Sequence, residues 1–297
     1  MMRQKVLITG GSGLLATNWA LTIRDKFSVV LVLHKRIIDI PGIDFDIINL
    51  SSVCEINRKF SKHKPDIVVN TAGLTSVEKC EKYPKLAKEI NTNIAENIAI
   101  VCNELDIKLV HISTDHLFSG KDRMMTEGHN VRPQNIYART KYYAETKVGN
   151  SCKNALIIRT NFYGWGTSYR KSFSDFIISS LIQQKKIILF SDVFYTPILI
   201  KTLVHAVHDL VNIDESGTFN IVGSDRISKF EFGKKVADCF SLDKGMIEPG
   251  HLRDNLSLVN RPFDMSLSNN KVCKILKREI STVKSDLFLL KNKEMTL

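Results

Sequence analysis

A tyrosine and a lysine four positions apart, Tyr137 and Lys141, have the clearest potential for catalysis in this sequence. On a helix, residues i and i+4 share one face, so the phenol and the ammonium would point into the same space. A phenol is a weak acid at neutral pH, and a neighbouring ammonium favours its ionised form. The pair is therefore suited to exchanging a proton with a substrate oxygen while a hydride moves to or from the carbonyl carbon. The lysine can also hold the ribose of a nicotinamide cofactor.

Hydroxyl-bearing residues end the apolar stretch that precedes this pair, in Ile112-Ser113-Thr114-Asp115. The carboxyl end of a strand is where parallel sheets bind their ligands. Thr114 or Ser113 could there hydrogen-bond a substrate carbonyl and stabilise the negative charge that develops on its oxygen. A Tyr-x-x-x-Lys spacing alone is common on exposed helices. The second motif, in the right order along the chain, favours the catalytic interpretation.

A glycine-rich turn follows the first apolar run and opens a helical stretch, in Gly10-Gly11-Ser12-Gly13-Leu14-Leu15-Ala16. Gly11-x-Gly13-x-x-Ala16 fits the dinucleotide-binding pattern, in which glycines let the backbone approach a pyrophosphate and a small third residue keeps the helix close to the sheet. The N–H groups and the positive dipole end of the helix receive the negative charge. We expect cofactor contacts at Gly10, Gly13, Leu14 and Leu15. A plain glycine-rich turn without a ligand is the alternative.

The end of the second apolar run bears on the choice between NAD and NADP. An NAD-preferring site usually has Asp or Glu there, about 20 residues after the glycines, to hold the ribose 2′-hydroxyl. This sequence has Lys35 and Arg36 instead, which could pair with a 2′-phosphate through charge-assisted hydrogen bonds. We predict a preference for NADPH, with NADH use left open. Solvated surface charges are the alternative interpretation of the two residues.

Five continuous apolar runs, at 6–9, 29–33, 67–70, 109–113 and 155–159, must position these residues. Helical stretches follow at 14–25, 85–104 and 135–149. This alternation is typical of a parallel sheet covered on both faces. The predicted fold class is α/β, a Rossmann-type doubly wound parallel sheet with a smaller C-terminal substrate-binding lobe. The NAD(P)-binding Rossmann domain is predicted at 1–164. Residues 165–297, with helices near 229–240 and 281–290, would form mainly the substrate-binding lobe, with segments returning to the main sheet.

Composition limits the class of protein further. With 297 residues, 43% of them hydrophobic and 25% charged, the chain resembles ordinary globular proteins. Its six cysteines are scattered without metal-ligand spacing, so no metal site is predicted. The apolar run near the start ends at Gly10 and no long apolar segment follows, which predicts a cytoplasmic protein without a membrane partner. The net charge of +11 suits an anionic ligand, and dispersed basic residues without a nucleic-acid motif argue against nucleic acid.

With these motifs in place, the chain resembles the extended short-chain dehydrogenase/reductases, and within them the dTDP-4-dehydrorhamnose reductase group. The resemblance spans nearly the whole length and its most specific parts lie outside the glycine turn and the Tyr-Lys pair. It is carried by Thr9 to Gly13, Asn70-Thr71-Ala72-Gly73, Val77 to Glu81, Ile90-Asn91, Ser113 to Gly120, Tyr137 to Lys141 with Glu145, Arg159-Thr160, and Arg261 to Leu267 followed by Lys271.

The resemblance implies that Thr114, Tyr137 and Lys141 form a catalytic triad for NADPH-dependent reduction of the C4 keto group of a nucleotide-linked 4-keto-6-deoxy sugar. Tyr137 would donate the proton. Asn49 and Leu50 would lie beside the adenine, and Ala72 and Gly73 would line the cofactor channel together with Tyr137 and Lys141. Substrate contacts are expected at Thr75, Ser113, Asp115, His116, Asn161 and Arg261. The product would feed polysaccharide or glycan synthesis, and a homodimer is left open.

Three departures from the family pattern leave alternatives open. His116 stands where the family usually has Tyr, and Val193-Phe194-Tyr195-Thr196-Pro197 where a glycine and then Pro-Thr are more frequent. Asn161 to Gly164 is closer to the epimerase and dehydratase branches. A dehydratase typically has Asp and then Glu after the catalytic threonine, and a combined 3,5-epimerase and 4-reductase has a cysteine beside it, whereas this chain has Asp115-His116. A nucleotide-sugar epimerase or dehydratase, and a non-catalytic NADP-binding regulatory subunit, are the alternatives to a reductase.

Overall fold

A computed structural model describes residues 3–255 and 257–292, which fall into two compact units. Unit 1 comprises Met1–Thr114, Asn135–Ile158 and His208–Phe219, and unit 2 comprises Asp115–Gln134, Arg159–Val207 and Asn220–Leu297. Because the two units interleave along the chain, they do not meet at one sequence position. The functional boundary expected after Gly164 stays a prediction.

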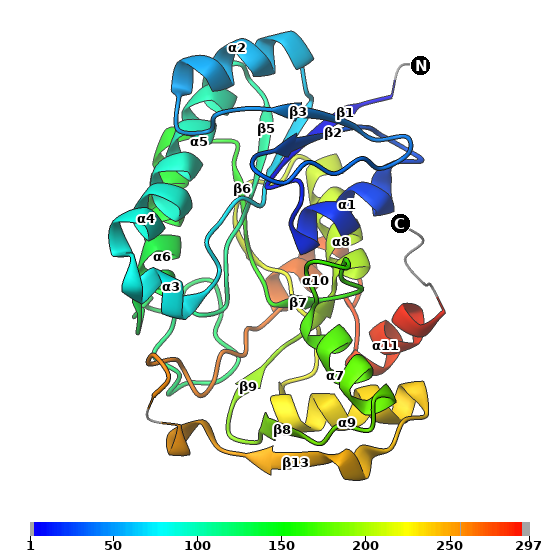
Figure 1. The fold of residues 1–297 in the computed structure, drawn as a ribbon. Coiled ribbons are helices and arrows are strands. Elements are labelled where there is room, and N and C mark those ends of the chain that lie inside the picture. Colours follow the sequence, from blue (N-terminus) through cyan, green and yellow to red (C-terminus); the bar gives the residue numbers. More distant parts are fainter. Residues whose placement is uncertain (1–2, 256, 293–297) are drawn as a thin grey trace. The chain divides into compact units, whose positions relative to one another are not determined.

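A seven-stranded sheet with the order β11-β6-β5-β4-β1-β2-β3 forms the centre of unit 1 (Figure 1). Its neighbouring strands run parallel, and β6 and β11 do so through the bonds Gly217 N–H to Ala155 O and Ile221 N–H to Arg159 O. The order reverses between β1 and β4, which is the place where such sheets bind ligands. The predicted doubly wound parallel sheet is confirmed. The strands are β1 (Lys5–Thr9), β2 (Ser28–Leu33), β3 (Asp44–Ile47), β4 (Ile67–Asn70), β5 (Lys108–Ile112), β6 (Leu156–Arg159) and β11 (Gly217–Asn220).

Helices cover both faces of this sheet (Figure 1). Alternate strand residues such as Leu7, Val68 and Leu109 pack against α2, α5 and α6 on one face, while α1 covers the other. The expected helix at 85–104 is real but interrupted by a π-helical turn. The helices are α1 (Leu14–Ile23), α2 (Val53–His63), α3 (Val77–Lys82), α4 (Pro84–Lys88), the π turn η1 (Glu89–Asn93), α5 (Ile94–Glu104), α6 (Ile136–Ser151) and the end of α8 (Ile200–Asn212).

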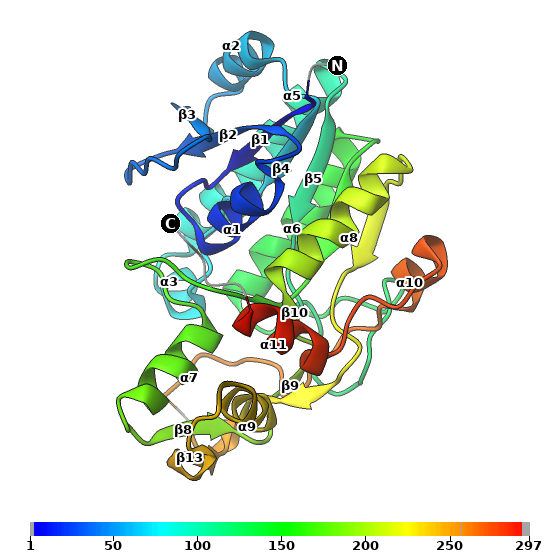
Figure 2. The same ribbon diagram turned by 90° about the vertical axis from the view of Figure 1, so that its right-hand side faces the viewer.

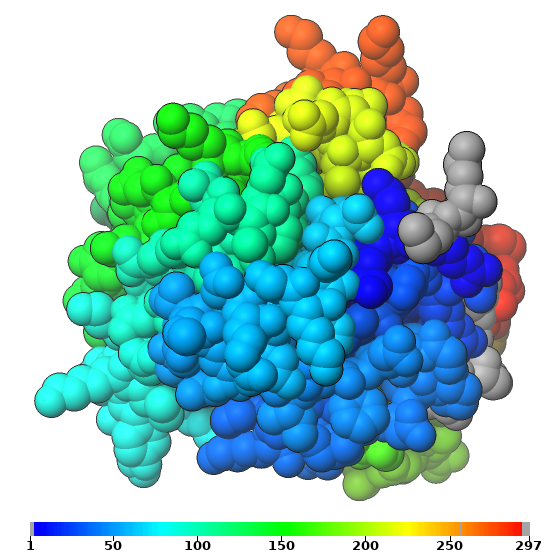
Figure 3. All heavy atoms as spheres, turned by 90° about the horizontal axis from the view of Figure 1, so that it is seen from above, coloured from blue at the N-terminus to red at the C-terminus, as the bar shows by residue number. Residues whose placement is uncertain are grey.

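Strand β3 and helix α2 are tied together at the edge of the sheet. Lys59 and His63 of α2 both lie 2.7 Å from a carboxylate oxygen of Asp46 in β3. Figure 3 shows α2 and the 34–52 segment side by side on the face seen from above. This edge lies next to the strand end that carries the residues expected to choose between NAD and NADP.

Unit 2 is a mixed α/β unit whose strands pair in twos: β7 (Phe162–Tyr163) with β10 (Ile198–Leu199), β9 (Phe194–Tyr195) with β12 (Ile227–Ser228), and β8 (Ile187–Phe190) with β13 (Ile247–Gly250). Helix α9 packs against α7, β8 and β13 (Figure 2), and Phe232 of α9 lies at the centre of the unit's core beside Tyr163, Phe173 and Tyr195. The helices are α7 (Phe173–Ile182), α9 (Lys229–Phe240), α10 (Asn270–Leu276), α11 (Val283–Lys291) and the single turns η2 (Lys244–Met246) and η3 (Leu252–Asp254). In the described part of the chain, no helix combines the length and apolar character that a membrane crossing requires.

Candidate active site

The glycine turn after β1 is packed so closely that side chains could not be added to it. Gly10 has φ +66°, and a Cβ there would lie 3.0 Å from the backbone of Ala72; a Cβ on Gly11 would lie 2.9 Å from Leu31 and Leu33. Gly13 caps α1 without a side-chain hydrogen bond. The first N–H groups of α1 therefore stay available for an anion, as the dinucleotide pattern requires.

A chain of buried polar side chains crosses the sheet beneath this turn. The Thr9 hydroxyl donates to Asn70 Oδ1 (2.7 Å), and Asn70 Nδ2 lies 3.1 Å from Nδ1 of His111, so that β1, β4 and β5 are linked. The backbone N–H of Ala72 also donates to Asn70 Oδ1 (3.2 Å). Burial, reinforced by the charge of Lys141, lowers the pKa of His111 well below its usual value, so this imidazole is neutral. These hydrogen bonds hold the Ala72–Gly73 backbone against Gly10.

Helix α6 presents Tyr137 and Lys141 at the carboxyl end of β5. Asn135 starts the helix by accepting a hydrogen bond from Ala138 N–H (2.9 Å). Lys141 is 5% exposed, and its ammonium donates to the carbonyl of Ile112, two residues before Thr114, at 2.6 Å. Burial lowers the pKa of Lys141 to about 8, against the opposing effect of Glu145. Thr114 and Tyr137 are buried as well, so unit 1 holds all three predicted catalytic residues.

The π turn positions a residue that the spacing of motifs alone does not reveal. Asn91 accepts a hydrogen bond from Leu74 N–H (2.7 Å) and donates to Thr140 Oγ1 (3.0 Å) on α6, one position before Lys141. Thr92 donates to the carbonyl of the same Thr140 (2.8 Å). Two adjacent residues of this turn thus hydrogen-bond the same residue of α6, and π turns are frequent at functional sites. Asn91 thereby couples the 72–75 loop to the helix that carries Tyr137 and Lys141.

The remaining expected cofactor and substrate residues of unit 1 lie around the same end of the sheet. Lys35 and Arg36 follow β2 and are exposed, while Leu50 is partly buried. The side chain of Asn49 accepts a hydrogen bond from Ser51 N–H (3.1 Å), which fixes its oxygen at the start of α2. Thr75 is exposed on the 72–75 loop, Ser113 is buried, and Leu14 and Leu15 open α1.

Unit 2 holds the other expected substrate residues as a charged cluster. The Asp115 carboxylate is buried and accepts a hydrogen bond from Asn161 Nδ2 at 2.6 Å. His116 Nε2 lies 3.9 Å from the other Asp115 oxygen. Burial lowers the pKa of His116; Asp115 opposes this effect, and Lys229 and Arg261 add to it. Asp115, His116, Asn161 and Arg261 thus belong to one cluster, which Lys229 joins.

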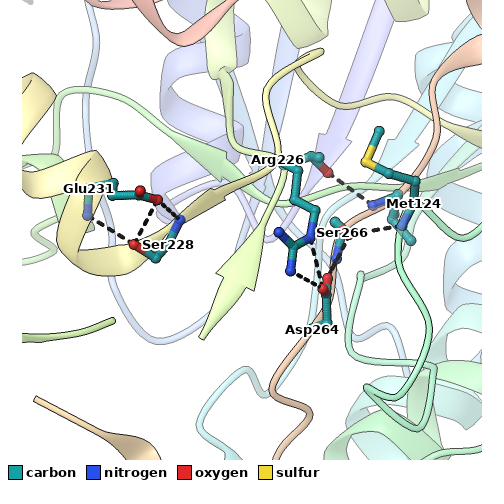
Figure 4. Close-up of polar contacts among 8 residues, drawn as sticks. Met124, Arg226, Ser228, Glu231, Asp264 and Ser266 are labelled. Atoms are coloured by element: carbon teal, nitrogen blue, oxygen red, sulfur yellow. Dashed lines mark hydrogen bonds and ion pairs between the residues drawn. The ribbon is translucent and has the colours of Figure 1, made fainter. Parts of the chain in front are cut away.

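The late Arg-Pro segment is held by an ion pair and a hydroxyl (Figure 4). Arg226 donates through Nε to Asp264 at 2.8 Å, and its guanidinium lies 3.9 Å from the centre of the Phe194 ring. The other oxygen of Asp264 accepts a hydrogen bond from the Ser266 hydroxyl (2.6 Å), which in turn accepts one from Met124 N–H (2.9 Å). These bonds fix the segment that carries Arg261 to the loop that begins with Asp115 and His116.

Two residues of unit 2 that the motifs do not indicate lie in the cluster. The Lys229 ammonium is 3.4 Å from the centre of the Tyr195 ring, and the charge of Asp115 acts on both residues. From the sequence alone, a lysine at the start of a helix is interpreted as a solvated surface charge. No sequence pattern therefore distinguishes Lys229 from an ordinary exposed lysine. Within 3–255 and 257–292, no group of three or more His, Cys, Asp or Glu side chains is arranged to hold a metal ion.

Comparison with known proteins assigns the chain to a family. The family model described as "RmlD substrate binding domain" matches residues 3–293. The chain belongs to this family. Curated relatives include a probable low-salt glycan biosynthesis reductase of Haloferax volcanii, 30% identical over 83% of this chain and 84% of the relative, and dTDP-4-dehydrorhamnose reductase of Escherichia coli, 29% identical over 67% of each.

Solved structures described as dTDP-4-dehydrorhamnose reductases share the fold. A dTDP-4-dehydrorhamnose reductase of Bacillus anthracis, crystallised in complex with NADP, superposes with a TM-score of 0.88 over 99% of this chain and 100% of that one, at 23% identity. A similar protein from Sulfolobus tokodaii gives 0.81 at 28% identity, over 94% of this chain and 97% of that one.

Proposed function

We propose that this protein reduces the C4 keto group of a nucleotide-linked 4-keto-6-deoxy sugar with NADPH. The observation that carries the proposal is the buried Lys141 ammonium bound to the Ile112 carbonyl, beside Thr114 and one helical turn from Tyr137. An ammonium held at that point can lower the proton affinity of the phenolate that forms when Tyr137 gives up its proton. A structural lysine would gain little from such burial, because the desolvated charge costs stability.

Thr114, Tyr137 and Lys141 each have a separate role in the proposed reaction. The Thr114 hydroxyl donates a hydrogen bond to the substrate carbonyl oxygen, and Tyr137 gives its proton to the same oxygen. Lys141 stabilises the resulting phenolate and holds the nicotinamide ribose. NADPH, when bound, supplies the hydride. We assign the substrate contacts to Thr75, Ser113, Asp115, His116, Asn161 and Arg261.

The cradle for the cofactor fits a dinucleotide. The close contacts at Gly10 and Gly11 exclude side chains there and keep the turn tight, as the approach of backbone to a pyrophosphate requires. We assign the pyrophosphate to Gly10, Gly13, Leu14 and Leu15, the 2′-phosphate to Lys35 and Arg36, the adenine to Asn49 and Leu50, and the nicotinamide end to Ala72, Gly73, Tyr137 and Lys141.

The names of relatives support the reaction class. Among them are dTDP-4-dehydrorhamnose reductase of Escherichia coli and a dTDP-4-keto-6-deoxy-D-glucose reductase of Streptomyces niveus, which is 26% identical over 84% of this chain and 83% of the relative. The Bacillus anthracis relative was crystallised with NADP. We further propose a cytoplasmic protein that acts as a homodimer, which light scattering and cell fractionation test, and a product that enters glycan synthesis.

The test follows NADPH absorbance with a panel of nucleotide-linked 4-keto-6-deoxy sugars, with Tyr137→Phe as control. Removing the phenolic proton should reduce the rate by roughly 10²-fold or more while the variant still binds NADPH. Oxidation that depends on one sugar and is lost in the variant supports the reductase. An absence of turnover with NADPH binding intact contradicts it and favours a regulatory subunit. Tightly bound NAD in the purified protein would favour an epimerase instead.

A further inference from the structure

Lys229 occupies an unusual place for a lysine, the first residue of helix α9. Its ammonium lies 3.4 Å from the centre of the Tyr195 ring and 4.9 Å from that of Phe173. The start of α9 is fixed by a capping box, in which the Ser228 hydroxyl accepts a hydrogen bond from Glu231 N–H (3.1 Å) and the Glu231 carboxylate accepts one from Ser228 N–H (3.0 Å; Figure 4). The position of Lys229 is therefore set by the backbone.

This placement is energetically unfavourable for a charge. The N-terminus of a helix carries a partial positive charge, which repels an ammonium. Burial also lowers the pKa of Lys229 to about 8, and only the nearby Asp115 opposes this effect. Neither helix stability nor packing explains a lysine at this point, since a methionine would fill the same space between the two rings without the cost of desolvation.

Two donor groups of this cluster, on Lys229 and Tyr195, have no hydrogen-bond partner in the part of the chain that the structure describes. Among residues 3–255 and 257–292, the Lys229 ammonium makes no side-chain hydrogen bond; it lies over two aromatic rings and interacts with the charge of Asp115 and with His116. The hydroxyl of Tyr195, a residue only 2% exposed, likewise has no hydrogen-bond partner in that part of the chain. Buried polar groups are hydrogen-bonded in most proteins, and exceptions often indicate a ligand.

The residues that the charge of Asp115 affects indicate which part of a ligand these donors would bind. Its negative charge acts on both Lys229 and Tyr195, and the residue is joined by a peptide bond to Thr114, the proposed partner of the reacting carbonyl. The donors therefore belong to the cluster of the residue that directly follows Thr114 in the chain. In a nucleotide-linked keto sugar, the group that reacts is part of the hexose and not of the diphosphate.

We propose that Lys229 and Tyr195 form a recognition subsite that donates hydrogen bonds to oxygen atoms of the hexose. This inference rests on the proposed function and adds two specificity-determining residues to it. Both lie in segments where motifs gave no assignment, and Tyr195 belongs to the stretch Val193–Pro197 that departs from the family pattern. The subsite would thus help to determine which sugar this protein accepts.

Calorimetric titration with NADP⁺ present can test the subsite with unreactive probes. The ligands are dTDP-glucose and UDP-glucose, compared with dTDP and UDP alone. The proteins are the wild type, Lys229→Met, Tyr195→Phe, and Lys235→Met as a control from an exposed position of the same helix. Tyr195→Phe keeps the ring under the ammonium and removes only the hydroxyl. It therefore remains decisive if Lys229→Met fails to fold.

We expect the variants to bind nucleotide sugars more weakly than the wild type does, and to bind nucleoside diphosphates about as well. Lys229→Met should raise the Kd of the preferred nucleotide sugar about tenfold or more, and Tyr195→Phe about threefold or more, because each leaves a sugar oxygen without its donor. The Kd of the matching nucleoside diphosphate should stay within about twofold, and Lys235→Met should leave every Kd unchanged. In the reductase assay, KM should rise more than kcat falls.

The other outcomes separate the two proposals. Equal weakening of nucleoside diphosphate and nucleotide sugar would assign Lys229 to the diphosphate and overturn the hexose subsite. Unchanged binding in both variants would make the cluster structural and overturn it as well. If the wild type binds NADP⁺ but none of the four ligands, the proposed function and the subsite both fail for dTDP- and UDP-linked sugars.

Discussion

Replacing Lys141 by methionine should change how the stability of the protein depends on pH. Methionine has a similar length and no charge, so the substitution removes the buried ammonium and largely keeps the packing. Burial lowers the pKa of this lysine from 10.5 to about 8, a difference worth about 3 kcal/mol between the two protonation states. Lys141 is 5% exposed, so solvent screening does not remove this effect.

The sign follows from proton binding. Below about pH 8, both the folded and the unfolded chain bind the proton, and the folded state bears the full cost of the buried charge. Between about pH 8 and 10.5, the unfolded chain keeps the proton while the folded chain releases it, so this cost is relieved as the pH rises. Relative to the Lys141→Met variant, the free energy of unfolding of the wild type should therefore increase by about 2 kcal/mol between pH 7 and 9.5.

Urea unfolding of both proteins at the two pH values measures this difference. Other groups that titrate in the same range, such as Lys229, contribute equally to both proteins and cancel. Lys147→Met, at a position of the same helix where the side chain is 51% exposed, should show a much smaller pH effect. Parallel pH profiles for the wild type and Lys141→Met would refute the reasoning. The reductase activity of Lys141→Met should be lower than that of the wild type by roughly 10²-fold or more.

Three further variants test the geometry around the site. Asn91→Ala should lower the free energy of unfolding by about 2 kcal/mol in urea titrations, because buried partners on the 72–75 loop and on α6 lose their hydrogen bonds, and kcat should fall while the dinucleotide still binds. Gly11→Ala should abolish NADPH binding in a fluorescence titration, since its Cβ would lie 2.9 Å from Leu31. Replacing Lys35 and Arg36 together by alanine should weaken NADPH about tenfold and leave NADH unchanged; equal weakening of both cofactors would remove the two residues from the 2′-phosphate site.

The central strands were predictable because burial on both faces leaves continuous apolar runs. Strand β3 gave no such signal, since it is an edge strand in which Phe45 and Ile47 alternate with aspartates and are themselves exposed. The two-residue strands of unit 2 are too short for any period. Helix α2 did carry a helical signal, with Val53, Ile56 and Phe60 at i, i+3 and i+7, and could have been predicted.

Residues of the site were predictable where one spacing determines the contact. Tyr137 and Lys141 share a helix face by their separation alone, and the glycine turn has a pattern that its geometry requires. The role of Asn91 depends on a π turn, and the residue types in Glu89–Asn93 do not predict that turn. Lys229 depends on two distant aromatic residues that only the folded chain brings to it.

The two lysines with lowered pKa values lead to a common argument. Lys141 in unit 1 and Lys229 in unit 2 both have a pKa of about 8 because burial disfavours the ammonium. Lys141 donates to the carbonyl of Ile112, two residues before Thr114, and the charge of Asp115, the residue after Thr114, acts on Lys229. A folded protein gains stability by replacing such charges with apolar side chains, so we attribute the presence of Lys141 to the proposed reaction and that of Lys229 to the proposed recognition of the sugar. If both assignments hold, Lys141→Met should reduce kcat with little change in nucleotide-sugar affinity, whereas Lys229→Met should do the reverse, and the double variant should show the product of the two effects.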